Sequence, residues 1–393
     1  MEIESIDFYY LSMPEVLDIG DGSQDVLLVR ARAGEWVGWG ECEAAPLVSI
    51  ASLVAPMSHS ACKPVQDSVL GQRLDSPEDI RRIAAEVRGN SFDQLQADHT
   101  WSGIDIALWD LLGHRFEEPV HRLLSTAPAR PKKPYASILF GADPAETYQR
   151  GVAAVAAGYT AVKFGWEGFG LGDVRSDREQ LAAAREGIGP DADLLVDAAM
   201  AWDADADRAL LRAAAFEQFR LLFIEEPFVP GADAAYRALR SGLTTVRTAG
   251  GEGCHTAEMA IGMVDHAEID FVQIDTGRIG GISAARRVAE YARTKGVTFL
   301  NHTFTSHLAL SASLQPYVDD ANSGWCEFPI EPKPVSYDLT TTHLGRNADG
   351  LVTVPDAPGL GLEINTATVA QYLVETEITV AGQVLYRTPE LHP

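Results

Sequence analysis

Two scarcities limit what this 393-residue chain can be. Only four cysteines occur, and no two form a CxxC pair, so we expect neither a disulfide framework nor a structural zinc site but four small buried apolar residues: Cys42, Cys62, Cys254 and Cys326. No apolar run approaches the ~20 residues that cross a bilayer, and the start, MEIESIDFYY, has no basic segment leading into an apolar stretch. We therefore expect a cytoplasmic protein that does not bind membranes.

Positive charge is also scarce. The chain has 31 Lys and Arg against 56 Asp and Glu, a formal net charge of −25, which disfavours nucleic acid as a partner because phosphate backbones attract clustered basic residues. HExxH, GxSxG and GxxxxGK[ST] are absent, and GFGLGD at 168–173 lacks the GxGxxG spacing. The sequence therefore does not support assignment as a common metalloprotease, an esterase or a protein with a phosphate-binding loop. With 46% hydrophobic residues, the chain can nevertheless bury a large core.

From about residue 134 onward, short apolar runs alternate with longer helical segments, as expected of βα units around a parallel sheet. Helices are predicted after Asp143-Pro144, over 203–218 and over 281–295. Closure into a barrel is the economical topology, and a doubly wound open sheet is the rival. The predicted strands are eight, at 135–140, 160–164, 193–198, 221–226, 245–250, 269–275, 297–301 and 325–328.

The first 128 residues follow another pattern, typical of a separate α+β domain. Strands are predicted at 3–11 and 26–32, a Gly-rich turn at GEWVGWGE (34–41), and helices at 76–88 and 97–115. The Pro-rich linker STAPARPKKP (125–134) marks its boundary with a barrel domain over 129–350. A tail over 351–393 contains one more strand pattern, at 378–386, which periodicity alone does not place.

Ionisable residues recur at the predicted carboxyl ends of successive strands. Their spacings are 34, 28, 27, 23, 27 and 25 residues, about the length of one βα unit of a barrel: Lys163, Asp197, Glu225, Glu252, Asp275, His302 and Glu327. Side chains at these ends converge on one rim, where barrel enzymes carry their catalytic groups.

The rim residues suggest specific chemistry. Asp197, Glu225 and Glu252 would repel one another unless a hard divalent cation neutralised them, and carboxylate oxygens suit Mg²⁺. An Asp275–His302 pair would make a proton acceptor near neutral pH. The alternative interpretation is that these residues cap helices or form salt bridges at the rim.

Lys163, in a chain with only six lysines, would face the metal site and could hold a substrate carboxylate or the charge developing on it. A surface lysine at a strand end is the alternative for this residue.

Together these residues and motifs resemble the enolase superfamily, in its mandelate-racemase-like branch that includes the acid-sugar dehydratases. The resemblance covers nearly the whole chain, through GWGECEAAP (38–46), SGIDIALWDLLGH (102–114), VDAAMAW (196–202), FIEEP (223–227), GGEG (250–253), IDTGRIGGIS (274–283), LNHTFTSHLALSASL (300–314), CEFP (326–329) and APGLGLE (357–363).

The resemblance implies an N-terminal α+β capping domain over a (β/α)₇β barrel, a modified TIM barrel to whose cap the C-terminal segment returns. It also implies Mg²⁺ on Asp197, Glu225 and Glu252, a His302–Asp275 general base, Lys163 as electrostatic partner and Glu327 hydrogen-bonding the substrate carboxylate. The loops near 15–26 and 42–57 would be cap segments that close over the substrate and select it, and a homo-oligomer is implied.

Two departures from the family pattern bear on the reaction. Ala199 stands where an Asn is usual, and Gly165 stands where many relatives place a second basic or polar group. With His302 as the one confident base, the favoured reaction is proton abstraction beside a carboxylate and loss of a β-hydroxyl, converting an aldonate or aldarate into a 2-keto-3-deoxy acid. A racemase or epimerase with Lys163 as second base is the alternative, and a barrel that keeps its metal without catalysis is a third.

Five further residues are candidates for contacts to distal hydroxyls or a second carboxylate, with packing at the rim as the alternative for each: Trp166, Arg278, His255, Asn301 and His307. The sequence does not specify which acid sugar is used.

Overall fold

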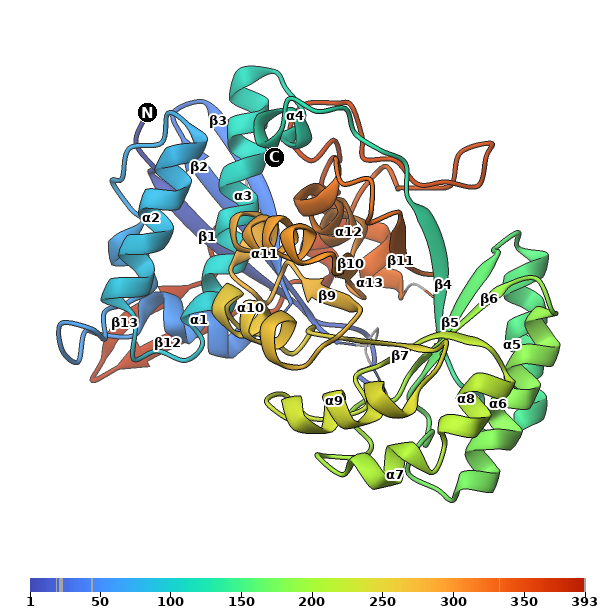
Figure 1. Cartoon of the computed structure of the whole chain (residues 1–393). Helices are drawn as coiled ribbons and strands as arrows, with labels where there is room; N and C mark the ends of the chain where they lie inside the picture. Colours follow the sequence, from blue (N-terminus) through green and yellow to red (C-terminus); the bar gives the residue numbers. More distant parts are fainter. Residues whose placement is uncertain (19, 21–23, 44, 332, 392–393) are drawn as a thin grey trace.

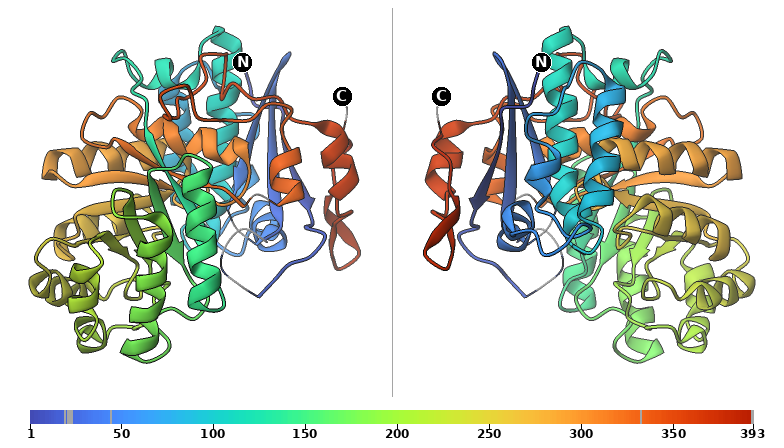
Figure 2. Two further views of the ribbon diagram at one scale, coloured as in Figure 1. Left: turned by 90° about the vertical axis from the view of Figure 1, so that its right-hand side faces the viewer. Right: turned by 90° about the vertical axis from the view of Figure 1, so that its left-hand side faces the viewer.

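The computed structural model describes residues 1–18, 20, 24–43, 45–331 and 333–391. Its N-terminal part is built on a three-stranded antiparallel sheet in the order β1-β2-β3, with β1 at Ser5–Leu11, β2 at Val26–Ala33 and β3 at Trp36–Cys42 (Figure 1). The central strand β2 is buried along nearly its whole length. Helices cover one face of this sheet and the C-terminal segment covers the other (Figure 2).

The prediction of a Gly-rich turn over 34–41 is wrong, because only residues 34 and 35 turn and β3 starts at Trp36. Gly38 and Gly40 lie within β3, against helix α3 (Ala97–Phe116). A Cβ at Gly38 would stand 2.1 Å from the carbonyl oxygen of Ala107, and one at Gly40 2.2 Å from that of Gly103. These glycines therefore allow close packing of backbones rather than a turn.

The other helices of this part are α1 (Pro46–Val54), the short 3₁₀ helix η1 (Val65–Ser68), α2 (Pro77–Asn90) and α4 (Val120–Leu124). Helices α2 and α3 confirm the predicted helices, and a capping box between Ser76 and Asp79 starts α2. Helix α1 falls within 42–57, so that segment is not a simple loop. Of the segment 15–26, residues 19 and 21–23 lie outside the described residues, as does residue 44.

All eight predicted barrel strands are confirmed. They pair in parallel in the order β10-β9-β8-β7-β6-β5-β4-β11, so chain neighbours are sheet neighbours and β11 lies beside β4, which excludes the doubly wound sheet. The strands are β4 (Lys133–Leu139), β5 (Ala161–Gly165), β6 (Asp193–Asp197), β7 (Leu221–Glu225), β8 (Arg247–Gly250), β9 (Phe271–Asp275), β10 (Thr298–His302) and β11 (Trp325–Pro329).

The seam between β10 and β11 is closed by a side chain. The Asn301 amide accepts a hydrogen bond from the backbone nitrogen of Glu327 at 2.9 Å and donates to its carbonyl oxygen at 3.3 Å. Tyr317 also donates its hydroxyl to Asn301, at 2.9 Å. Asn301 thus supplies a donor and an acceptor where the backbone ladder is interrupted.

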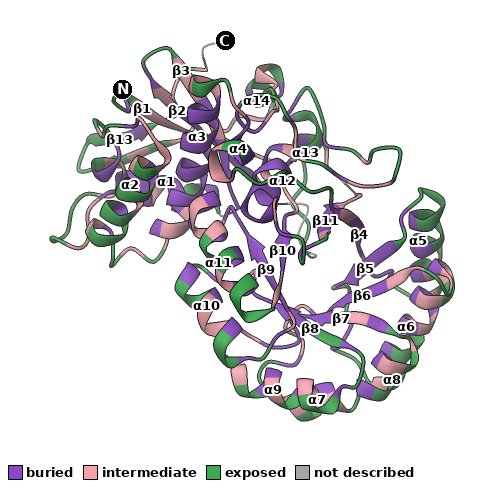
Figure 3. Ribbon diagram, turned by 45° about the horizontal axis from the view of Figure 1, so that its top comes forward, coloured by how far each residue is buried: buried purple, intermediate pink, exposed green. Residues whose placement is uncertain are grey.

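Helices surround the barrel, with exposed residues on their outer faces and buried strands inside (Figure 3). Asp143 caps α5 as predicted, and α11 has the predicted bounds. The predicted helix 203–218 is two short helices instead, interrupted at Leu211 and Arg212, where the Arg212 side chain reaches Asp177 at 2.5 Å. The helices are α5 (Pro144–Ala156), α6 (Val174–Ile188), α7 (Ala206–Leu210), α8 (Ala213–Gln218), α9 (Asp233–Gly242), α10 (Ala257–His266), α11 (Gly281–Lys295) and α12 (His307–Leu314).

The C-terminal tail returns to the N-terminal sheet. After η2 (Gln315–Tyr317) and α13 (Pro334–Asp338) come α14 (Thr366–Tyr372) and a hairpin of β12 (Glu377–Val380) and β13 (Gln383–Arg387), where one strand was predicted at 378–386. Leu373 bridges to Leu11, and Tyr386 donates its hydroxyl to the carbonyl of Phe8. Among the described residues, no helix combines the length and apolarity needed to span a membrane.

Three of the four cysteines are buried, Cys62 is partly exposed, and all four are free.

Candidate active site

The predicted rim residues lie at one end of the barrel because parallel strands bring their carboxyl ends together. Asp197 faces Glu225 in register across β6 and β7, and Asp275 faces His302 across β9 and β10. All seven candidates belong to or directly follow their strands, and except for Glu252 all are buried. The roles of these residues remain predictions, but the structure brings their side chains to one rim.

Lys163 is the central cation of the rim. Its Nζ donates to both carboxylate oxygens of Glu225, at 2.7 and 2.9 Å, and forms an ion pair with Glu327 at 2.5 Å. Burial lowers the pKa of Lys163, but Glu225, Glu327 and the other rim carboxylates outweigh it and hold this pKa well above its usual value. This environment favours the charged form of the Lys163 side chain.

The metal-ligand candidates carry more negative charge than Lys163 balances. Burial raises the pKa of Asp197 to about 7, with Glu252 adding to the effect, and burial raises the pKa of Glu225 well above its usual value. Burial is the main cause of these shifts, and repulsion between the rim carboxylates adds to it.

In donor type and charge, these three carboxylates fit Mg²⁺, which prefers oxygen ligands. Within the described residues, no group of three or more His, Cys, Asp or Glu side chains is already arranged around a common point for a metal ion. Glu225 is turned to Lys163, and Glu252 Oε2 lies 3.2 Å from His302 Nε2. The Glu225 carboxylate is thus paired with Lys163, and the Glu252 carboxylate lies beside the imidazole of His302.

The predicted base pair is formed. His302 Nδ1 lies 2.8 Å from Asp275 Oδ2, and Asp275 Oδ1 accepts a hydrogen bond from the backbone nitrogen of Gly277 at 2.7 Å. An Asp at Nδ1 fixes the tautomer that leaves Nε2 as the proton acceptor. The pair is buried, so its geometry is held from all sides.

Backbone strain is concentrated just after the strands that carry Lys163, Asp197 and Glu225. Non-glycine residues with positive φ follow all three: Trp166 (59°) and Glu167 (50°), Ala199 (49°) and Met200 (59°), and Glu226 (38°). Positive φ is costly for such residues and accumulates at functional sites. The rim is therefore a place where the fold sustains strain.

Both departures noted in the sequence have a structural counterpart. A Cβ at Gly165 would stand 3.0 Å from Asp197 Oδ2, so glycine makes room for that carboxylate. At Ala199, the backbone nitrogen donates to Asp197 Oδ1 at 2.8 Å, so a backbone contact fixes the aspartate in place of a side chain.

The five candidates for distal contacts separate into different environments. Trp166 lines a small enclosed space at the rim together with Ser137, Lys163, Asp197, His302 and Phe304. Arg278 lies near the rim carboxylates, 3.5 Å from Glu252 Oε1.

The other three candidates point elsewhere. Asn301 closes the β10–β11 seam, so its prediction as a substrate contact is wrong. His307 accepts a hydrogen bond from the backbone of Leu344 at 3.2 Å and packs on Tyr337, in contact with the segment that follows β11. His255 is exposed and lies 2.9 Å from His99 of helix α3.

Sequence reasoning missed several polar residues at the rim. Ser137 donates to Glu327 Oε1 at 3.0 Å, and the backbone nitrogen of Thr303 donates to Glu327 Oε2 at 3.1 Å. Glu226 accepts from the backbone nitrogen of Gly251 at 3.2 Å, next to Glu252, and burial raises its pKa to about 8. The doubled glutamate in FIEEP was the one available signal for Glu226.

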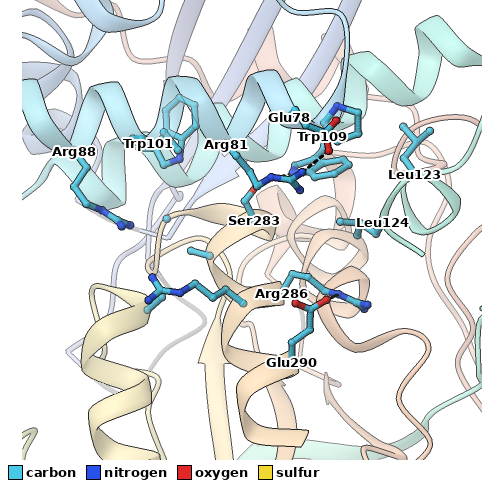
Figure 4. Close-up of a pocket in the computed structure, with 17 residues that line it drawn as sticks. Glu78, Arg81, Arg88, Trp101, Trp109, Leu123, Leu124, Ser283, Arg286 and Glu290 are labelled. Carbon is cyan, nitrogen blue, oxygen red and sulfur yellow. Dashed lines mark hydrogen bonds and ion pairs between the residues drawn. The ribbon is translucent and has the colours of Figure 1, made fainter. Parts of the chain in front are cut away.

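A larger groove, of about 710 Å³, lies away from the rim, between α2, α3 and α4 on one side and α10 and α11 on the other (Figure 4). Its arginines are paired: Arg81 with Glu78, Arg88 and Arg287 with Glu258, and Arg286 with Glu290. None of the seven rim candidates lines this groove. The rim is thus the better candidate for chemistry.

Comparisons with known proteins agree with this geometry. The family model for the enolase C-terminal domain-like fold matches residues 147–368, more than half of the chain. D-galactarolactone cycloisomerase of Agrobacterium fabrum is 30% identical over 351 residues, covering 86% of this chain and 88% of that protein. D-gluconate dehydratase of Thermoproteus tenax is 30% identical over 295 residues, covering 72% of this chain and 58% of that protein.

Among solved structures, a protein of Rhodobacter sphaeroides described as a predicted mandelate racemase superposes with a TM-score of 0.95 at 52% identity, covering 99% of this chain and all of that one. The family match, the long alignment to the cycloisomerase and this superposition agree with one another. The chain therefore belongs to the enolase superfamily and, within it, to the mandelate-racemase-like group.

Proposed function

We propose that this protein is a Mg²⁺-dependent dehydratase that converts an aldonate or aldarate into a 2-keto-3-deoxy acid. The observation that carries the proposal is the buried His302–Asp275 pair beside Lys163 and three carboxylates. That set supplies one base and one fixed cation, which is what the removal of a proton beside a carboxylate requires.

In the proposed reaction, His302 Nε2 removes the proton from the carbon next to the substrate carboxylate, while Asp275 holds Nδ1 and stabilises the imidazolium. A divalent ion on Asp197, Glu225 and Glu252 would supply positive charge for the substrate carboxylate. Lys163 would stabilise the negative charge that develops there.

The second half of the reaction uses the same histidine. Protonated His302 returns its proton to the β-hydroxyl as the C–O bond breaks, so that water leaves and an enol remains. The enol then tautomerises to the 2-keto-3-deoxy acid. One residue serves as base and then as acid, so a second proton-transfer group is not needed.

The dehydratase name of the Thermoproteus relative supports this reaction, although the chain spans only 58% of that protein. The cycloisomerase relative favours a second candidate, in which the leaving oxygen belongs to a ring of the substrate. Proton abstraction by His302 would be the same in both, and ring opening would replace loss of water.

The racemase or epimerase alternative is less well supported. It needs a second base on the opposite face of the substrate, and Gly165 offers no side chain there. Lys163, the other candidate, is paired with Glu225 and Glu327, and these carboxylates favour its protonated form. A barrel without catalysis would have no need of the His302–Asp275 pair.

The test is to incubate the purified protein and Mg²⁺ with a panel of aldonates, aldarates and their lactones in D₂O. Formation of a 2-keto-3-deoxy acid from an open-chain acid supports dehydration. Exchange of the α-proton without loss of water would reject dehydration and favour an epimerase. Conversion of the cyclic substrates alone would favour the cycloisomerase.

A further inference from the structure

The carboxyl end of cap strand β3 reaches the barrel rim beside the proton-transfer pair. Glu41 is the next-to-last residue of β3, and Glu43 directly follows the strand. Glu41 contacts the loop that follows His302, and Glu43 contacts the loop that follows Asp275. The cap thus contacts both loops of the pair.

The contact of Glu41 is a buried hydrogen bond between domains. Ser306 donates its hydroxyl to Glu41 Oε2, and the same hydroxyl caps helix α12 by accepting from the backbone nitrogens of Leu308 and Ala309 at 3.1 and 3.3 Å. Glu41 is 1% exposed and Ser306 4%. Among the described residues, the other oxygen of Glu41, Oε1, has no hydrogen-bond partner. Burying a carboxyl group with one oxygen unpaired destabilises the folded protein, so the burial of Glu41 points to a role other than stability.

The loop that Ser306 ends is part of the rim. Its Phe304 ring lies 5.6 Å from the His302 ring and 6.0 Å from Lys163 Nζ, and it lines the enclosed space at the rim. At the start of the loop, the backbone nitrogen of Thr303 donates to Glu327. Glu41 therefore fixes the far end of a four-residue loop that packs on the base and on the cation.

Glu43 contacts the loop that follows Asp275 with its side chain, whose Oε1 lies 3.4 Å from an Arg278 guanidinium nitrogen, and with its backbone. Its backbone nitrogen donates to the carbonyl oxygen of Gly277 at 3.1 Å, two residues after Asp275. A Cβ at Gly277 would stand 2.8 Å from that nitrogen, so this approach requires glycine. The tight docking of β3 on the loop after Asp275 is independent of Ser306 and supports the same role for the strand end.

We propose that Glu41 is a positioning residue: from the capping domain it holds the loop 303–306, and through Phe304 it positions His302 for proton transfer beside the Lys163 cation. The expected effect of Glu41 on catalysis rests on the proposed function, whereas its anchoring of the loop does not. Glu41 does not touch the reacting atoms, and its carboxylate acts through Ser306.

The experiment uses the full chain with the variants Glu41→Ala, Glu41→Gln and Ser306→Ala. Ser283→Ala is the matched control, because Ser283 accepts a hydrogen bond from the Trp109 indole of the cap at 2.9 Å, in the groove away from the rim (Figure 4). Hydrogen exchange is measured by mass spectrometry on peptides spanning 303–309. Kinetics are measured on the acid that the panel identifies.

We expect Glu41→Ala and Ser306→Ala to speed exchange over 303–309 by about tenfold or more, and Glu41→Gln and Ser283→Ala to leave it within about threefold of wild type. Glu41→Ala should lower kcat by about tenfold or more with KM within about threefold, and Glu41→Gln should restore most of kcat, because its amide oxygen still accepts from Ser306.

Unchanged exchange over 303–309 in folded Glu41→Ala, or in Ser306→Ala if the first variant does not fold, overturns the proposal. Faster exchange in Glu41→Ala with unchanged kcat also overturns it, as does a loss of kcat in Glu41→Ala that Glu41→Gln does not restore. Exchange needs no substrate, so a wild-type protein inactive on every acid of the panel, with the exchange results as expected, speaks against dehydration and leaves the anchoring by Glu41 standing.

Discussion

His302 and Asp275 face each other in register at the ends of neighbouring parallel strands, with Nδ1 of the histidine 2.8 Å from Oδ2 of the aspartate. The register fixes this pair through the backbone, and burial leaves little room for the imidazole to turn. Nε2 lies toward Glu252, so the base points at the predicted metal ligands. Proton transfer and metal binding are therefore expected at one rim.

Replacing the base should separate catalysis from metal binding. We expect His302→Asn to lower turnover by about 10³-fold or more, because the variant lacks the proposed base, and to leave Mg²⁺ affinity within about threefold. Turnover is measured by keto-acid formation, and Mg²⁺ affinity is measured by titration calorimetry. Turnover at the wild-type rate would show that another residue is the base.

Lys163 should matter for stability as well as for turnover. Lys163→Met leaves Glu225 and Glu327 without their buried cation, and breaking such a pair costs about 3–5 kcal/mol in the free energy of unfolding. Lys133→Met is the control, since its pair with Asp193 is partly exposed and should cost about 1 kcal/mol or less. Urea denaturation measures the loss of unfolding free energy in both variants. Equal losses would contradict the assignment of Lys163 as the central cation of the rim.

Asn301 is expected to stabilise the barrel rather than to bind substrate. Asn301→Ala removes the bridge to Glu327 and leaves buried polar groups unpaired, at about 1–3 kcal/mol per group. Hydrogen exchange should rise along β10 and β11. Asn365→Ala, which removes only the cap of α14, should affect that helix alone. Slow exchange at the seam in Asn301→Ala would contradict the assignment.

We expect Asp105 to make the free energy of unfolding depend on pH. It lies on α3 and accepts a hydrogen bond from the backbone nitrogen of Ser283 at 3.0 Å, at the start of α11, and burial raises its pKa to about 7. A carboxyl group with a higher pKa in the folded state destabilises that state once ionised. The cost is absent below about pH 4, grows as the pH rises to about 7, and is constant above it.

The difference in unfolding free energy between Asp105→Asn and wild type, measured by urea titration, should therefore shift in favour of the variant between pH 4 and pH 8. The shift is on the order of 4 kcal/mol. A difference independent of pH would mean that Asp105 is not perturbed in the folded protein.

The barrel strands and the rim residues can be predicted from sequence because both follow a repeat. Buried strands recur once per βα unit, and a functional residue at each carboxyl end inherits that spacing, as Lys163 and Asp197 show. Contacts between domains follow no such repeat. Nothing near Glu41 in the sequence indicates that it meets Ser306, 265 residues away.

Side-chain direction was also beyond the sequence. Asn301 and His302 are adjacent, yet alternation along β10 sends one into the seam and the other to the rim. The glycines of β3 suggest a turn from sequence alone, because their packing role depends on the approach of α3.

The most direct test of the account is a crystal structure grown with Mn²⁺ in place of Mg²⁺, with anomalous scattering locating the ion. The account predicts one peak at the barrel rim, bound by oxygens of Asp197, Glu225 and Glu252 and close to the His302–Asp275 pair. A peak held by other residues, or none at the rim in crystals of a protein that turns over acid sugars, would contradict it.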